Sequence, residues 1–292
     1  MVVLLTMTVS VRSMIMAERL VTDIIQDLPS RIPFVILDLA YHPSVLEWIY
    51  EEVEARQPGS CRPLLLGTDF QERWQVGPAL VDLRYVPGAR DDLISRYKET
   101  LPGIFLTHPA ESLDEVAAWL QQFLLISREM QQSLLRFYDP RVFGSFLSVL
   151  DPQQYGHFIP PGVTWYWQNG LQWCAASSGT ELDRQARPDA LTWQFRDTQI
   201  DEFSARRRRE FVDALTDNYG KFTPSDSPKK YVDDVVTFAE AMGMDSKADI
   251  EKVLRLLIQK ESQPADPFYS SLVERVDLTA YQKLEAIEDG KS

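Results

Sequence analysis

The sequence has 292 residues and a formal net charge of −13. Hydrophobic residues make up 45% of it and aromatic residues 11%, which excludes a globally disordered chain because enough apolar surface is present for a core. The acidic charge argues against nucleic acid and anionic membrane as partners, and it favours a basic partner or solubility alone.

The two cysteines, Cys61 and Cys174, are far apart, and each stands in an apolar setting. This usage predicts two buried thiols in a reducing compartment rather than a disulfide. We therefore expect a cytoplasmic protein with one large domain or two modest ones.

The first 15 residues resemble a signal peptide only superficially. No basic residue precedes their apolar run, and Arg12 interrupts it early. We interpret residues 1–15 as an upstream extension or a disordered N-terminus, with Met14 and Met16 as alternative translation starts. No stretch approaches the roughly 20 apolar residues of a membrane span, so no membrane partner is expected.

Residues 16–197 alternate between helical and strand patterns. Continuous apolar runs bounded by turn residues predict strands that are covered on both faces, and apolar residues at helical spacing predict the helices between them. The expected strands are residues 34–39, 63–66, 78–83 and 103–107, and the expected helices are residues 18–28, 43–57, 91–99 and one that begins at Ser112. This alternation predicts an α/β domain of three layers with a mostly parallel sheet.

The stretch Leu134–Trp167 organises the middle of the chain. Its apolar start predicts a buried strand over residues 134–138, and Asp139-Pro140 is a strong helix start because the carboxylate can cap the first free N–H groups. Asp151-Pro152 repeats that signal before an aromatic strand at residues 165–167. We expect Asp139 to cap its helix while Arg136 or Arg141 pairs with a carboxylate; the alternative is that these arginines contact a partner directly.

Beyond Trp167 the pattern becomes helical. Residues 171–175 and 191–195 are expected to be two strands that extend the sheet in antiparallel fashion. Residues 198–292 are expected to form an α-helical C-terminal lobe, with helices at residues 198–219, from Ser227, from Ser246, and at residues 267–287.

No motif for catalysis, cofactor binding or metal binding is present. The chain lacks a Gly-x-Ser-x-Gly elbow, a glycine-rich phosphate loop, and Cys or His pairs at the spacing of metal ligands. The three histidines, His42, His108 and His157, stand in turns or beside prolines. Asp38 ends a buried strand and is the best single catalytic candidate, although capping of the following turn explains it as well.

Two groups of residues are candidates for partner binding. Arg206, Arg207, Arg208 and Arg209 are consecutive, so they surround a helix rather than form one basic face. Residues 198–292 hold 19 acidic and 14 basic residues, so ion pairing on the lobe surface is favoured over docking of an acidic segment. Aromatic residues suit interfaces, which makes Trp165, Trp167 and Tyr231 candidates for contact, with a core position as the alternative.

The run Arg136-Phe137-Tyr138-Asp139-Pro140-Arg141-Val142, with the helix and the Gln-rich turn that follow, resembles the type VI secretion effector chaperone/adaptor family. The shared domain of this family is domain of unknown function 4123, and the resemblance covers residues 33–167. It implies a structural role for Arg136, Tyr138, Asp139, Pro140 and Arg141.

The resemblance also implies a function. The protein would be a non-catalytic adaptor that binds a cognate effector toxin in the producing cell and helps to load it onto the VgrG spike, with the helical lobe as the more partner-specific part. Two alternatives remain open: a hydrolytic enzyme that uses Asp38 and a histidine, and an immunity protein that blocks a toxin.

Overall fold

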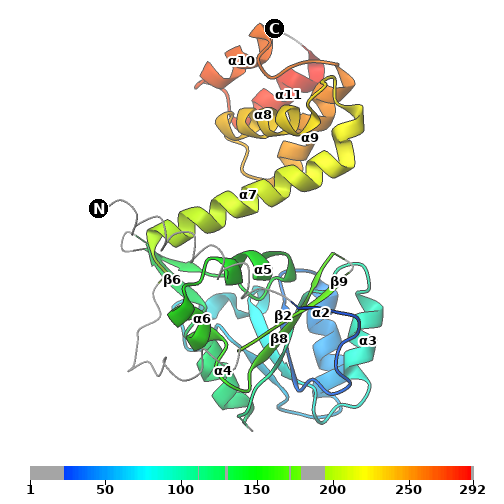
Figure 1. The fold of residues 1–292 in the computed structure, drawn as a ribbon, viewed down its shortest axis with the longest axis vertical. Helices are drawn as coiled ribbons and strands as arrows, with labels where there is room; N and C mark the ends of the chain where they lie inside the picture. Colours follow the sequence, from blue (N-terminus) through cyan, green and yellow to red (C-terminus); the bar gives the residue numbers. More distant parts are fainter. Residues whose placement is uncertain (1–22, 111, 129–130, 171, 179–194, 291–292) are drawn as a thin grey trace, which may run out of the picture. The chain divides into compact units, whose positions relative to one another are not determined.

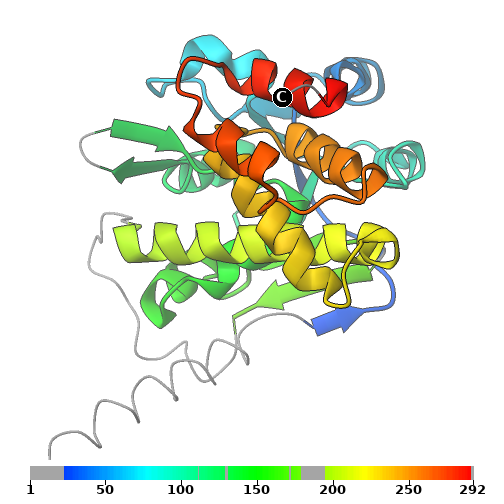
Figure 2. The same ribbon diagram turned by 90° about the horizontal axis from the view of Figure 1, so that it is seen from above.

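The computed structural model describes residues 23–110, 112–128, 131–170, 172–178 and 195–290. The chain divides into two compact units, residues 1–203 and residues 204–292. Figure 1 shows both units as a ribbon, and Figure 2 shows the same ribbon from above.

The first unit is built on a sheet of seven strands in the order β1-β9-β8-β5-β2-β4-β3, and each neighbouring pair is antiparallel. The strands are β1 Asp23–Ile25, β2 Phe34–Asp38, β3 Cys61–Pro63, β4 Pro78–Asp82, β5 Gly103–Thr107, β8 Thr164–Asn169 and β9 Gln172–Ser177. A separate two-stranded ribbon contains β6 Leu125–Arg128 and β7 Gln131–Leu134 (Figures 1 and 2).

The prediction of a mostly parallel sheet is wrong, and the pairing explains why. The crossovers do join parallel strands: β2 leads through α2 (Pro43–Trp48) and η1 (Ile49–Glu54) to β3, and β4 leads through α3 (Ala89–Arg96) to β5. However, β4 lies between β2 and β3, and β2 lies between β4 and β5. The helical connections fix the direction of successive strands, but they do not show which strand is inserted between them.

Helices cover both faces of the sheet, because the central strands are apolar on both sides. Phe34 and Ile36 of β2 pack on a core shared with α4 (Leu113–Gln121), α5 (Pro140–Ser148) and α6 (Pro152–Phe158). Val35 and Leu37 face the opposite core, which contains buried residues of α2 and α3. Figure 1 shows α2 and α3 on one side of β2 and β8, and α4 and α6 on the other.

The pairing of β2 with β5 requires a glycine. Gly103 of β5 is the register partner of Leu37 in β2, and a Cβ built at Gly103 would lie 1.9 Å from the carbonyl oxygen of Ile36. No side chain fits at that distance, so Gly103 allows the two central strands to approach each other.

Some elements of this unit differ from the sequence predictions. Residues 23–25 form the edge strand β1 against β9, although a helix was predicted over residues 18–28, of which residues 18–22 lie outside the described part. The strand predicted over residues 134–138 is absent: β7 ends at Leu134 and a turn follows. Phe137 is fully buried in that turn, so its apolar character reflects the core and not a strand. Most of the strand predicted at residues 191–195 lies outside the described residues.

The second unit is helical and has its own core. Helix α7 (Asp197–Tyr219) continues into it from the first unit and is followed by η4 (Gly220–Phe222), α8 (Pro228–Ala241), α9 (Lys247–Gln259), α10 (Pro267–Glu274) and α11 (Ala280–Asp289). The single helix predicted over residues 267–287 is therefore two helices. The second of these, α11, is capped by Thr279 in a reciprocal capping box with Gln282.

Candidate functional site around Arg136 and Asp38

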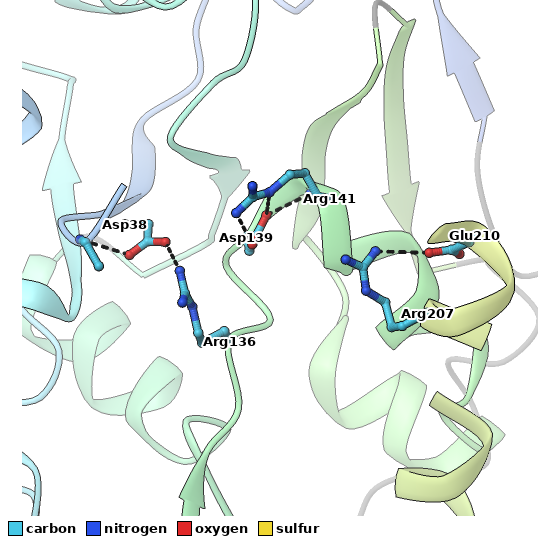
Figure 3. A network of polar contacts seen from close by, with 7 residues as sticks. Asp38, Arg136, Asp139, Arg141, Arg207 and Glu210 are labelled. Carbon is cyan, nitrogen blue, oxygen red and sulfur yellow. Dashed lines mark hydrogen bonds and ion pairs between the residues drawn. The ribbon is translucent and has the colours of Figure 1, made fainter. Parts of the chain in front are cut away.

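The candidate site lies where the loop after β7 meets the end of β2. Asp38 is the last residue of β2 and is only 2% exposed. One carboxylate oxygen accepts a hydrogen bond from the backbone N–H of Ala40 at 3.1 Å, and the other accepts from the guanidinium of Arg136 (Figure 3). The contact joins residues 98 positions apart, so it ties the middle of the chain to the sheet.

Burial is the main influence on Asp38. It raises the pKa of the Asp38 carboxyl above its ordinary value, and the nearby charge and hydrogen bond of Arg136 oppose the rise only in part. Burial also opposes the charge of Arg136, but Asp38 reverses this effect and raises the pKa of the guanidinium. The two side chains are therefore electrostatically dependent on each other.

Asp139 begins helix α5 beside this pair. Its carboxylate caps the helix by accepting from the backbone N–H of Arg141 at 3.0 Å, as the Asp-Pro signal predicts. The same carboxylate accepts from the Arg141 side chain at 2.9 and 2.8 Å. Burial alone would raise the pKa of Asp139, but these bonds to Arg141 hold it below its ordinary value.

The residues between the two arginines are buried. Phe137 and Tyr138 lie in the aromatic core, and burial raises the pKa of the Tyr138 hydroxyl. In contrast, the side chains of Arg136 and Arg141 remain 46% and 58% exposed. Residues 136–141 are therefore anchored by buried rings and carboxylates, while the guanidinium groups of Arg136 and Arg141 lie at the surface. Tyr41 is close enough to contribute to the raised pKa of Arg141.

Asp38 does not contact a histidine in the part of the chain that the structure describes. The ring of His42 caps α2, where its Nδ1 accepts from the backbone N–H of Ser44 at 3.2 Å. His108 accepts in a similar way from the backbone N–H of Ala110 at 3.0 Å. Both histidines therefore have local structural roles, as the turn positions in the sequence predict.

Trp165 and Trp167, which the sequence suggested as partner contacts, are core residues. Trp165 is fully buried, stacks on Phe158 with ring centroids 4.9 Å apart, and donates a hydrogen bond to the Phe158 carbonyl at 3.3 Å. Trp167 is 1% exposed and packs edge-on against Phe143. The suggestion of partner contact is corrected for both, because neither ring is accessible.

The same correction applies to Tyr231 in the helical unit. It is 2% exposed, and its hydroxyl donates to the carbonyl of Ser262 at 2.8 Å. Composition alone does not separate the aromatic rings of a core from those of an interface.

Three of the four consecutive arginines form ion pairs within the helical unit. Arg206 and Arg207 contact Glu210 at 3.5 and 3.0 Å, the second of which is drawn in Figure 3. Arg208 reaches across to α8, where it contacts Asp233 at 2.5 Å and Glu240 at 3.0 Å. The predicted surface ion pairing is confirmed for these three residues.

The residues that the structure describes include no group of three or more His, Cys, Asp or Glu side chains placed to hold a metal ion. Over the same residues, no helix has the length and apolar character needed to cross a membrane. One cavity of about 570 Å³ in the first unit has three arginines in its lining, Arg31, Arg84 and Arg90, which the sequence patterns did not single out.

The comparisons with known proteins place this site in a family context. Residues 33–157 match the family model described as "Domain of unknown function (DUF4123)". This family is associated with adaptors that load effectors of the type VI secretion system. The match runs from the start of β2 through most of α6, and so contains both ion pairs of the candidate site.

No curated protein and no solved structure matches the chain.

Proposed function

We propose that the protein is a non-catalytic chaperone/adaptor that binds a cognate type VI effector in the producing cell, stabilises it, and helps to load it onto the VgrG spike. The observation that carries this proposal is the family match over residues 33–157, which contains the Arg136–Arg141 block. The helical unit lies outside the matched residues, and this is consistent with a unit that is specific to one partner.

The chemistry of the block supports binding rather than turnover. Both oxygens of Asp38 accept hydrogen bonds from the protein itself, so neither is directed at a substrate. The exposed guanidinium groups of Arg136 and Arg141 are suited to carboxylates of a partner, because arginine presents a planar fork of donors.

A second candidate function rests on the raised pKa of Asp38. A buried carboxyl of this kind at the end of a strand can serve as a general acid or base, which would make the protein a hydrolytic enzyme. Turnover of generic ester or phosphate substrates that is lost in Asp38→Asn would favour this candidate. An immunity protein would instead abolish the toxicity of its partner in a recipient cell.

Co-expression tests the proposed function. The product of a candidate effector toxin gene should be mostly insoluble when it is expressed alone, and it should become soluble and co-purify when this chain is present. Equal solubility of the toxin with and without this chain would contradict the chaperone role. Secretion of the toxin in a deletion strain, compared with the parent, measures the loading step separately.

A further inference from the structure

The helical unit contains a basic cavity of about 510 Å³ between α7 and α8. Six residues line it: Arg208, Arg209, Val212, Lys229, Lys230 and Asp233. Four of the six carry a positive charge, although the protein as a whole has a net charge of −13. Such a local reversal of charge sign creates a site to which anions are attracted.

The two lysines of this cavity are only weakly neutralised by the protein. Lys229 contacts Asp213 at 2.6 Å and Lys230 contacts Asp234 at 2.5 Å, but all four side chains are at least half exposed. Exposed pairs of this kind contribute little to stability, so a ligand carboxylate can replace the internal partner at low cost.

Arg209 supplies the uncompensated charge. Its side chain is exposed and lines the cavity, and it forms no hydrogen bond or ion pair with any residue described in the structure. Its neighbour Arg208 is different, because three side chains of α8 hold it: Asp233, Thr237 and Glu240. Arg208 therefore fixes one wall of the cavity, and Arg209 remains available to a ligand.

The placement of the lysines is unfavourable for the helix that carries them. Lys229 and Lys230 occupy the first turn of α8, which has no acidic residue, although the N-terminal end of a helix carries a partial positive charge. The pair from Lys230 to Asp234 also has its cation on the N-terminal side, which is the weaker order. An anion in the cavity would relieve this repulsion.

We propose that this cavity binds a carboxylate-rich peptide segment of the partner protein, an inference that rests on the proposed adaptor function. The cavity has room for one or two acidic side chains, and the buried side chain of Val212 gives it an apolar floor against which a peptide can pack. The net charge of −5 over residues 198–292 opposes a long polyanion such as nucleic acid, which would extend beyond the cavity.

The chain offers a matched pair of variants for the test. Arg209→Glu and Arg206→Glu make the same charge change in the same turn of α7, but Arg206 does not line the cavity. Its single ion pair, to Glu210 at 3.5 Å, is exposed. Both variants should fold like the parent, which thermal unfolding verifies.

The probe is a fluorescein-labelled hexaglutamate peptide, and the readout is fluorescence anisotropy with the full chain at low salt. We expect saturable binding that weakens at least tenfold in Arg209→Glu and less than twofold in Arg206→Glu. Absence of saturable binding, or equal losses in the two variants, would overturn the proposal. The proposal would also be overturned if a labelled oligothymidine bound more tightly than the hexaglutamate peptide and both variants weakened that binding equally. Such a result would indicate a surface that binds polyanions non-specifically.

The peptide assay does not need the effector, so its failure is distinct from failure of the adaptor function. If Arg209→Glu retrieves the effector from cells as well as the parent does, the cavity is not its docking site, although the adaptor function stands. If the parent binds the peptide in an Arg209-dependent way but retrieves no effector, the proposed function fails, and with it the assignment of the peptide to an effector.

Discussion

Replacement of Arg136 by alanine tests whether the ion pair with Asp38 supports the fold. Removal of one partner of a buried pair costs about 3–5 kcal/mol because the other charge is left without compensation. Since 46% of the Arg136 side chain is exposed, water solvates part of the pair, and we expect a loss of about 1–3 kcal/mol in the free energy of unfolding at pH 7. The protein should lose solubility as well as partner binding.

The pH dependence of this loss follows from the raised pKa of Asp38. A carboxyl whose folded-state pKa lies above its unfolded value destabilises the fold when it ionises, and this cost disappears as the pH falls through the raised folded-state pKa towards about 3.9. Alanine at position 136 removes the main opposing influence and raises that pKa further. The stability loss should therefore be largest at pH 7 and smaller at pH 5.

Urea denaturation followed by tryptophan fluorescence measures the effect. Arg96→Ala is the control, because its pair with Asp92 is long, at 3.8 Å, and exposed on both sides; it should cost less than about 0.5 kcal/mol. Addition of Asp38→Asn to Arg136→Ala should recover part of the loss, because no buried charge is then left unpaired. A loss in Arg136→Ala no larger than that of the control, or one independent of pH, would refute the reasoning.

Three further predictions concern other residues of the first unit. Gly103→Ala should cost about 2–3 kcal/mol or more in urea denaturation, because its Cβ would overlap the Ile36 carbonyl. Gly156→Ala is the control: no atom lies within 4 Å of its new Cβ, so it should be neutral or slightly stabilising. Similar denaturation midpoints for the two variants would contradict the close spacing of β5 and β2. Asp139→Ala should cost about 1–2 kcal/mol through loss of the helix cap. Because the pKa of Asp139 is lowered, this loss should be undiminished at pH 5, unlike that of Arg136→Ala. A loss that shrinks at pH 5 would contradict the pairing of Asp139 with Arg141. Burial raises the pKa of the Cys61 thiol to about 12. Its reaction with a disulfide reagent at pH 8 should therefore be at least about a hundredfold slower than that of free cysteine. Rapid labelling of Cys61 in the native protein would disprove this.

Local sequence signals predicted the elements that depend on local physics. The Asp139-Pro140 and Asp151-Pro152 pairs begin helices as expected, because cap and proline act on adjacent backbone groups. The strand over residues 103–107 and the helix opened by Ser246 also follow from patterns within a few residues. Such features do not depend on the remainder of the chain.

Long-range features could not be predicted in this way. The partner of Arg136 is 98 residues away at the end of β2, and no pattern within either segment connects them. Insertion of β4 between β2 and β3, and of β2 between β4 and β5, made the neighbouring strands antiparallel, and no pattern within one segment shows such an insertion. The basic cavity was missed for the same reason, since Arg209 and Lys229 meet only when α7 and α8 pack.

The most direct test of the adaptor function is an affinity pull-down of the tagged full chain from the cytoplasm of the native cells, followed by mass spectrometry. We predict recovery of one large toxin-like protein, alone or with the VgrG spike, and its absence from a tag-only control. Recovery of no such protein under conditions that retain the folded chain would contradict the account and redirect attention to Asp38 and an enzymatic role.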